Sequence, residues 1–269
     1  MDSPRGAAVS AVDFGLRGPR GWAFRGVEFD AEAGTLVAIE GPSGSGRTCL
    51  LLALTGRMRT TQGHAEVAGL RLPGKAAAVR RISALGPVAG VSELDPAFTV
   101  GEHLRERALL QRRFDGSLRS LLRPRAVRAA TERATIDAAL EAAALDVTGL
   151  PKAERTSVRD LERLEALRLS VALASMGGPR LLGVDDTDLK LPATDRAEAW
   201  KLLRTLADRG TTVLAVCSEA PPDTHTVRTG PSAAQDATHP VAEDATNPAD
   251  DDGTTEKERA DASAETGSA

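Results

Sequence analysis

The feature that most constrains the fold of this chain is a glycine-rich segment between two apolar runs. The segment consists of Gly41, Pro42, Ser43, Gly44, Ser45, Gly46, Arg47 and Thr48. The apolar run at residues 36–39 indicates a buried strand, and the run at 49–54 indicates a buried helix that ends near Gly56. Glycines let successive backbone N–H groups turn toward one anion, and the start of the helix adds its positive end. The segment therefore predicts a phosphate-binding loop.

The residue types in this loop also indicate a metal ion. We expect residues 41–48, together with Cys49 in the first turn of the helix, to bind a nucleotide, and Thr48 to hold Mg²⁺ through its hydroxyl. The pattern is G-x-x-x-x-G-K-[ST] with one change, because Arg47 replaces the lysine that reaches the outer phosphates. Arginine keeps the positive charge but spreads it over a bulky planar group. A glycine loop with another purpose is the alternative.

Charge is distributed unevenly along the 269 residues, which carry a net charge of −4. Residues 231–269 contain ten acidic and two basic side chains, so this segment accounts for −8 and residues 1–230 carry +4. A charge this small does not indicate nucleic-acid binding. The tail has too few apolar residues to form a core. We therefore expect a folded region over 1–230 and a disordered acidic tail over 231–269.

Cysteine usage and hydropathy bear on the compartment. Cys49 and Cys217 stand alone in apolar stretches, so neither a metal nor a disulfide spacing is present. No run of about 18 apolar residues is present, and residues 1–5 lack the basic start and apolar run of a signal peptide. We expect a cytoplasmic protein without a spanning segment.

Hydrophobic periodicity predicts alternating strands and helices after an N-terminal hairpin. The hairpin strands are expected at residues 9–14 and 22–29, and further strands at 35–39, 63–69, 79–85, 181–184 and 211–216. Helices are expected at 158–175 and 193–209, and an arginine-rich helical stretch, broken at Pro124, is expected at 99–144. From Pro221 onward few apolar residues occur, and no further element is expected there.

Continuously apolar strands that alternate with helices favour a mostly parallel, helix-covered sheet. We predict an α/β fold of the P-loop NTPase type, with an N-terminal antiparallel β part and an inserted α-helical subdomain at about 90–175. Ligands of such sheets bind at the carboxyl ends of the strands. Asp185 follows the strand at 181–184, so it is the candidate acid for a Mg²⁺ ion shared with Thr48. An aspartate that only caps the next turn is the alternative.

The order of these elements resembles the ATP-binding subunit of ABC transporters over roughly residues 9–220. Residues 63–69 are similar to that family's G-x-(V/I)-x-(V/I)-x-G strand, and residues 98–104 resemble its entry to the helical subdomain. Residues 169–174 with 179–182 resemble its "VALARAL…P-x-LLLLDEP" pattern, and residues 211–216 resemble the strand before its switch histidine. Individually these motifs are weak, but together and in this order they are specific.

The resemblance implies ATP and Mg²⁺ as ligands and a nucleotide-binding domain over 1–230. It further implies a separate transmembrane permease subunit as partner, and a homodimer or heterodimer of nucleotide-binding subunits. The chain would then lie in the cytoplasm, on the inner face of the membrane, through that partner. No nucleic-acid partner is implied.

Several positions depart from the family's motifs. The family's LSGGQ signature falls at Leu161–Glu165, where only the leucine matches, and a plain surface helix with Glu/Arg pairs is the favoured interpretation there. The catalytic glutamate corresponds to Asp186, which is one methylene shorter, and the switch histidine to Ser218, which cannot shuttle a proton. The Q-loop glutamine falls near Pro87, which has no side-chain ligand. We expect weakened nucleotide binding and strongly reduced hydrolysis.

Three functions remain open from the sequence. The first is an ATP-binding subunit that couples ATP binding, with slow or impaired hydrolysis, to a membrane protein. The second is a non-transport pseudo-ATPase that regulates a partner. A small P-loop kinase or GTPase is the third, and it is disfavoured because no guanine-reading N-K-x-D run is present.

Overall fold

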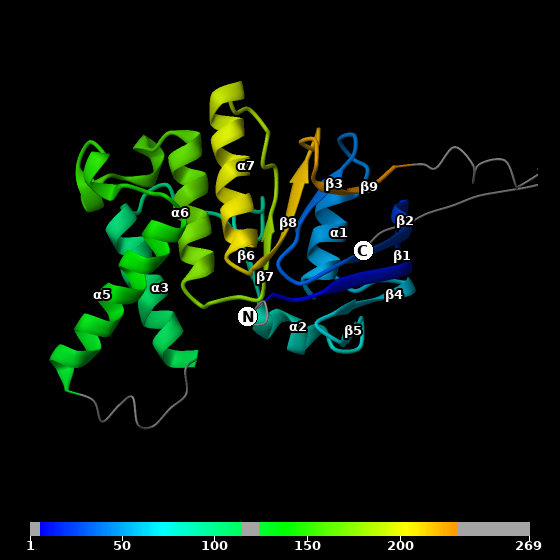
Figure 1. Cartoon of the computed structure of the whole chain (residues 1–269), viewed down its shortest axis with the longest axis horizontal. Helices are drawn as coiled ribbons and strands as arrows, with labels where there is room; N and C mark the ends of the chain where they lie inside the picture. The colour runs from blue at the N-terminus through cyan, green and yellow to red at the C-terminus, as the bar shows by residue number, and fades with distance from the viewer. Residues whose placement is uncertain (1–5, 115–123, 231–269) are drawn as a thin grey trace, which may run out of the picture. The chain divides into compact units, whose positions relative to one another are not determined.

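The computed structural model describes residues 6–114 and 124–230, which belong to a compact unit from Met1 to Pro231. Two sheets and a group of helices make up this unit (Figure 1). The predicted acidic tail at 231–269 and the centre of the predicted helical stretch, residues 115–123, lie outside the described residues.

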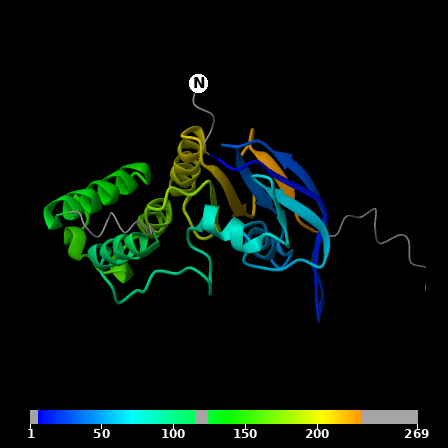
Figure 2. The same cartoon turned by 90° about the horizontal axis from the view of Figure 1, so that it is seen from below.

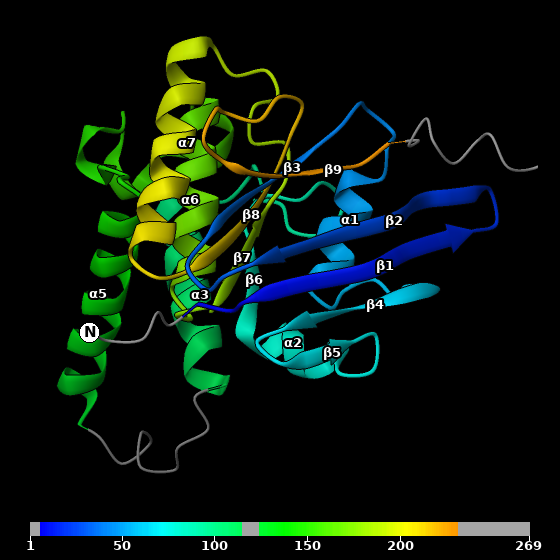
Figure 3. The same ribbon diagram turned by 45° about the vertical axis from the view of Figure 1, so that its right-hand side comes forward.

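The first sheet is antiparallel, with strand order β2-β1-β4-β5. Its strands are β1 (Val9–Gly18), β2 (Gly21–Ala31), β4 (Gln62–Val67) and β5 (Leu70–Leu72). β1 and β2 form the predicted N-terminal hairpin, with Val9 opposite Ala31 and Gly18 opposite Gly21. Figure 3 shows these long strands crossing in front of α1 (Arg47–Leu54).

The second sheet carries the glycine loop, and every pairing in it is parallel. Its order is β6-β7-β8-β3-β9, with β6 (Ser83–Leu85), β7 (Leu181–Val184), β8 (Thr212–Cys217), β3 (Leu36–Glu40) and β9 (His225–Arg228). β3 therefore lies between β8 and β9. The loop after β3 and Asp185 after β7 emerge at the same edge of the sheet, because parallel strands end on the same side.

Side chains of the parallel sheet alternate between two cores. Leu36 and Ala38 face a core built with helices α6 (Arg163–Ser175) and α7 (Ala193–Asp208). Val37 and Ile39 face a second core that contains α1 and the antiparallel sheet. The α1 helix is thus packed between the two sheets, and this packing orients the loop that precedes it.

A helical part extends from the parallel sheet on the side of α6 (Figure 2). It includes α3 (Val100–Phe114), α5 (Arg125–Ala142) and α6, and three short 3-10 turns lie between α5 and α6. The turns are η1 (Val147–Gly149), η2 (Ala153–Arg155) and η3 (Val158–Asp160). Pro124 stands at the N-terminal end of α5, as the predicted break requires. The α/β class with an antiparallel β part and a helical insertion is therefore confirmed.

The predicted strand at 79–85 is wrong over most of its length. Residues 76–82 form helix α2 (Ala76–Ile82), and only Ser83–Leu85 pairs with β7. Three successive alanines at 76–78 favour the helix, and Val79 is its buried residue. Val79 and Ile82, three residues apart, are too few apolar positions to distinguish the period of a helix from that of a strand.

The predicted continuous helix at 158–175 is interrupted. η3 ends at Asp160, Leu161 and Glu162 are extended, and α6 starts at Arg163. Of the residues aligned with the family's signature, Leu161 and Glu162 precede the helix and residues 163–165 form its first turn, which corrects the interpretation of the whole segment as a plain surface helix.

The absence of structure predicted after Pro221 is also wrong up to residue 230. Residues 225–228 form β9, which pairs in parallel with β3 from Val37 to Glu40. Val227 is the one buried residue of this strand, so the strand has no run of apolar residues that would mark it in the sequence. Backbone pairing to β3 supplies what hydrophobic burial does not.

One finding concerns membranes. Within residues 6–114 and 124–230, no helix combines the length and the apolar character that crossing a lipid bilayer requires.

Candidate functional site

The loop between β3 and α1 presents unpaired backbone donors. Gly46 caps α1 in a left-handed conformation, without a side-chain hydrogen bond, and no acidic residue lies in the first turn. The N–H groups of Gly44, Gly46, Arg47 and Thr48 have no acceptor among residues 6–114 and 124–230. Free N–H groups at a helix N-terminus form a favourable site for phosphate.

Two glycines of the loop have positive φ for different reasons. Gly46 has a φ of 83°, and a Cβ there would lie 1.9 Å from the carbonyl oxygen of Ala23 on β2. Gly44 has a φ of 82°, and a Cβ there would meet nothing within 4 Å. Gly46 is therefore required by packing against the antiparallel sheet, whereas Gly44 borders open space in which phosphate oxygens fit.

The candidate metal ligands are in direct contact. The Thr48 hydroxyl donates a 2.8 Å hydrogen bond to Oδ2 of Asp185, which is only 5% exposed. Burial raises the pKa of Asp185, the bond from Thr48 opposes that rise, and the nearby carboxylate of Asp186 adds to it. A hydroxyl and a carboxylate oxygen side by side suit Mg²⁺, which takes few protein ligands and completes its octahedron with phosphate oxygens and water. The described residues contain no group of three His, Cys, Asp or Glu side chains that could enclose a metal.

Arg47 extends from α1 toward the end of β8. Its guanidinium Nη1 donates a short hydrogen bond to the carbonyl oxygen of Cys217. The positive charge also lowers the pKa of Asp185 slightly, against the stronger effect of burial. The cation of the loop is thus close to the metal-binding acid, but one of its donors is engaged by the backbone of β8.

The two thiols of the site are held protonated. Burial and the charge of Asp185 raise the pKa of Cys49, which follows Thr48 on α1. Burial, followed by the charges of Asp188 and Glu40, raises the pKa of Cys217 to about 12. A thiol in this state is a poor nucleophile, so we assign neither cysteine a chemical role.

The two positions aligned with catalytic residues, Asp186 and Ser218, are both exposed. Asp186 has a φ of 48°, which is uncommon for a residue with a side chain, and its N–H donates to Oδ1 of Asp185. Oδ2 of Asp188 accepts hydrogen bonds from the N–H groups of Ser218 (2.8 Å) and Glu219 (3.2 Å). Asp188 therefore ties the segment after β7 to the segment after β8.

Sequence reasoning missed Asp188, although a third acid after the strand at 181–184 was a visible signal. It also missed Thr229, whose hydroxyl lies 2.7 Å from the hydroxyl of Ser45. No local pattern marks Thr229, because its partner is 184 residues away.

Pro87 lies beside the candidate metal site. Its carbonyl oxygen accepts a 3.0 Å hydrogen bond from the N–H of Asp185. The position aligned with the family's Q-loop glutamine is thus adjacent to Asp185, and it contributes a backbone carbonyl to the support of β7 and no side-chain ligand.

The segment 161–165 at the start of α6 has the opposite electrostatic character to the glycine loop. Glu162 caps the helix, and Oε2 of Glu165 accepts a 2.8 Å hydrogen bond from the N–H of Glu162. Acidic side chains here neutralise the positive end of the helix. This helix start therefore does not favour a second phosphate group.

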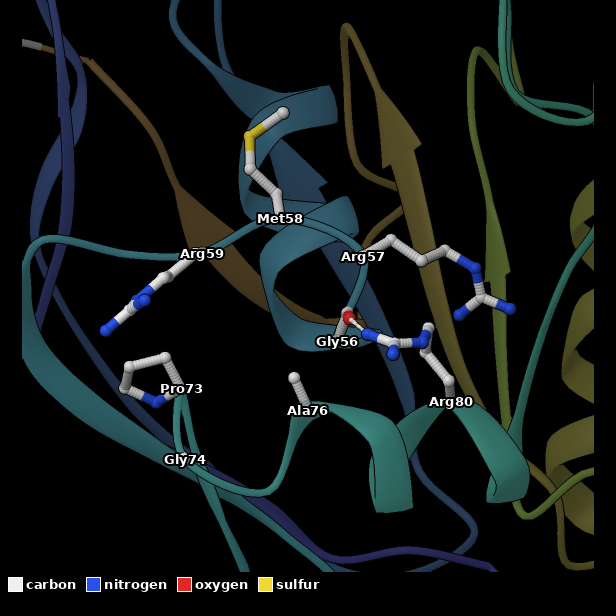
Figure 4. Close-up of a pocket in the computed structure, with 8 residues that line it drawn as sticks. All are labelled: Gly56, Arg57, Met58, Arg59, Pro73, Gly74, Ala76 and Arg80. Carbon is white, nitrogen blue, oxygen red and sulfur yellow. Dashed lines mark hydrogen bonds between the residues drawn. The ribbon is translucent and has the colours of Figure 1, made fainter.

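A separate pocket of about 370 Å³ lies between the C-terminal end of α1 and α2 (Figure 4). Arg80 donates to the carbonyl of Gly56 (2.7 Å), and Arg57 donates to the carbonyl of Thr55 (2.8 Å) and the hydroxyl of Ser83 (2.9 Å). Burial, with a smaller effect of Arg80, lowers the pKa of Arg57. These guanidinium groups satisfy the carbonyls that the end of α1 leaves open, and this is a structural role.

Comparison with known proteins identifies related sequences. The family model described as "ABC transporter" matches residues 24–188, which is more than half of the chain. "Nod factor export ATP-binding protein I" of Neorhizobium galegae is 31% identical over 188 residues, covering 70% of this chain and 48% of that protein. "Daunorubicin resistance ATP-binding protein DrrA3" of Streptomyces coeruleorubidus is 33% identical over 193 residues, covering 71% and 54%. The chain spans about half the length of these curated relatives.

Solved structures share the fold. The ATP-binding cassette MJ0796, in a dimeric post-hydrolysis state bound to ADP and Pi, matches with a TM-score of 0.60 at 20% identity, covering 78% of this chain and 88% of that one. A bacterial Atm1-family ABC exporter with ATP bound matches with a TM-score of 0.63 at 19% identity, covering 84% of this chain and 37% of that one. At these identities the likeness demonstrates the fold.

Proposed function

We propose that this chain, which belongs to the ABC transporter family, binds ATP with Mg²⁺ in the loop at 41–48 and serves as the ATP-binding subunit of a transporter. The observation that carries this proposal is the combination of free N–H groups around Gly44 with the contact between Thr48 and Asp185. The N–H groups form an anion site, and the Thr48 and Asp185 oxygens form a pair of ligands for a divalent cation. A nucleoside triphosphate with its metal ion requires both.

In this site each residue has a distinct task. The N–H groups of Gly44 to Thr48 bind phosphate oxygens, and Thr48 and Asp185 hold Mg²⁺. Bound Mg²⁺ neutralises charge on the outer phosphates. Arg47 attracts the terminal phosphates, but its bond to the carbonyl of Cys217 competes with them. We therefore expect affinity below that of a loop with a free lysine.

Hydrolysis is expected to be slow. Asp186, the proposed general base, is one methylene shorter than a glutamate, and Ser218 cannot carry a proton or a positive charge. A base displaced by about 1 Å can cost roughly a hundredfold in rate. We therefore expect this chain to bind ATP but to hydrolyse it slowly.

A membrane partner follows from the family and from the exposed surface. The names of the two relatives describe an export protein and a drug-resistance protein. Val91 and Phe98 are large exposed apolar side chains on the connection between β6 and the helical part. We propose that this connection docks on a separate transmembrane permease and keeps the chain at the cytoplasmic face of the membrane, as one of two nucleotide-binding subunits.

A second candidate function is a non-transport pseudo-ATPase that holds nucleotide and regulates a partner. The acidic start of α6 favours it, because Glu162 and Glu165 oppose the closure of a partner's nucleotide against this helix. On this alternative, the chain would bind ATP without engaging a multi-span membrane protein.

Three experiments test the proposal. Calorimetric titration of ATP into the full chain, with and without Mg²⁺, is expected to show binding that weakens when Mg²⁺ is withheld; an absence of binding would overturn it. A phosphate-release assay is expected to show turnover well below the ordinary range of about 1–10³ s⁻¹. Affinity purification from membranes, with a Phe98→Asp variant as control, separates the two functions: a co-purifying multi-span protein lost in the variant supports the transporter.

A further inference from the structure

The residue that follows β9 reaches back to the strand that carries the nucleotide loop. The N–H of Thr229 donates a 2.8 Å hydrogen bond to the carbonyl of Glu40, the last residue of β3. Thr229 is only 5% exposed. The preceding residue, Arg228, forms an ion pair with the carboxylate of Glu40 at 3.3 Å. The end of β9 is thus attached at the point where the loop begins.

The side chain of Thr229 bonds to the loop itself. Its hydroxyl lies 2.7 Å from the hydroxyl of Ser45 and 3.3 Å from the carbonyl oxygen of Glu40, to which it donates. A hydroxyl has one proton. When the proton of Thr229 is donated to Glu40, Ser45 donates to Thr229; either hydroxyl can be the donor across the 2.7 Å contact, and both directions join the same two side chains. This arrangement holds the Ser45 side chain toward β9 and away from the space in front of Gly44.

Packing at Gly41 reinforces the contact. A Cβ at Gly41 would lie 2.4 Å from the carbonyl oxygen of Thr229, and 2.6 Å from both the Ser45 and the Thr229 hydroxyl oxygens. The first glycine of the loop is therefore needed because Thr229 and Ser45 close over it. Both ends of the turn from Gly41 to Ser45 contact one residue that comes far later in the chain.

We propose that Thr229 is a positioning residue for the nucleotide loop, and that the end of β9 supports this loop from outside the nucleotide site. The proposal rests on the proposed function, because it concerns how the same loop binds phosphate. Thr229 does not touch the nucleotide; it sets the direction of Ser45 and of the backbone from Gly41, so that the following N–H groups converge. Loss of one such bond is expected to weaken ATP binding about 3- to 10-fold.

The test is a double-mutant cycle on ATP affinity. Thr229→Val, which keeps the shape but removes the hydroxyl, and Ser45→Ala are each expected to weaken ATP binding about 3- to 10-fold. The double variant is expected to bind no more weakly than the weaker single variant, since both remove the same bond. Thr229→Ser is expected to restore wild-type affinity. Additive losses, or an affinity of Thr229→Val equal to that of the wild type, would overturn the proposal.

A matched control, Thr226, lies three residues earlier, within β9. The Thr226 hydroxyl donates to the carbonyl of Thr224, within its own segment, so Thr226→Val is expected to leave ATP affinity unchanged. If Thr226→Val weakens binding as much as Thr229→Val, the effect belongs to the stability of β9, and the proposal is wrong.

A second measurement does not depend on nucleotide. Hydrogen exchange of the backbone amides of residues 41–48 is expected to be faster in Thr229→Val than in the wild type without ATP, and unchanged in Thr226→Val. Should the wild type fail to bind ATP, the proposed function fails, but this exchange result still tests the positioning role. Equal exchange in the wild type and Thr229→Val would overturn it.

Discussion

The starts of helices α1 and α6 are the two regions of this molecule whose comparison is most informative. α1 follows a glycine turn and α6 follows an extended segment, and both present a positive helix end. At α1 the N-cap is Gly46 and the first turn of the helix holds no acidic residue, so the N–H groups remain free. At α6 the N-cap is Glu162 and the first turn contains Glu165, and these acids neutralise the positive end of the helix. Side chains in the first turn therefore decide whether a helix start can bind a phosphate or only stabilises itself.

The largest effects are expected from substitutions of two glycines in the loop before α1, which should act in different ways. Gly46→Ala is expected to destabilise the fold by about 2–4 kcal/mol, since its Cβ would clash with the Ala23 carbonyl at a positive φ. Gly44→Ala is expected to cost about 1 kcal/mol, because its Cβ enters open space, yet to lose ATP binding. Thermal unfolding and ATP titration measure the two effects. Equal loss of stability in both variants would contradict the distinction.

The second prediction uses the raised pKa of Asp185. In the metal-free fold this carboxyl keeps its proton to a higher pH than in the unfolded chain. Its contribution to stability is therefore present below the unfolded pKa of about 3.9 and is lost as pH rises through the folded pKa. Mg²⁺ requires the ionised form, so Mg²⁺ affinity is expected to fall about tenfold per pH unit below the folded pKa.

Mg²⁺ titrations of the nucleotide complex across pH measure this dependence, and Asp185→Asn is the control. The variant is expected to bind Mg²⁺ weakly at every pH and to lose the pH step. An unchanged pH profile in Asp185→Asn would show that another group carries the titration.

A smaller effect is expected from Arg47→Lys. The planar guanidinium of Arg47 bonds to the carbonyl of Cys217, so only part of it faces a phosphate. A lysine carries its charge on one compact ammonium group, so its whole charge becomes available to the nucleotide. ATP affinity is expected to rise about fivefold. Arg47→Ala is the matched control and is expected to lower affinity. Calorimetry that finds the lysine variant binding no better than wild type would contradict competition by Cys217.

The smallest expected effect is a loss of stability on removing an acidic side chain at the start of α6. Glu165→Gln removes the charged acceptor of the Glu162 N–H, and it is expected to reduce stability by about 0.5–1 kcal/mol without changing ATP affinity. Glu198→Gln, in an exposed pair with Arg168, is the control and is expected to change stability by less than about 0.5 kcal/mol. Denaturant unfolding of both variants measures the difference.

Much of this fold was predictable because its signals are local. The glycine loop, the strand before it and the strand at 181–184 are contiguous patterns, and the structure places all three where the sequence does. The errors lie where local signals are weak or divided. Residues 76–82 combine alanines with a buried valine, and residues 225–228 form a strand mainly through backbone pairing to β3. Periodicity does not report backbone pairing to a distant strand.

The sequence by itself determined the class of the fold, the position of the phosphate loop and the residue types available to it, because these depend on propensity and spacing over short stretches. Only the tertiary structure decided which of these residues meet. Thr48 and Asp185 are 137 positions apart, and Ser45 and Thr229 are 184 apart. Their contacts exist because β3 is paired between β8 and β9, and the order of strands in a sheet is set by how the whole chain packs.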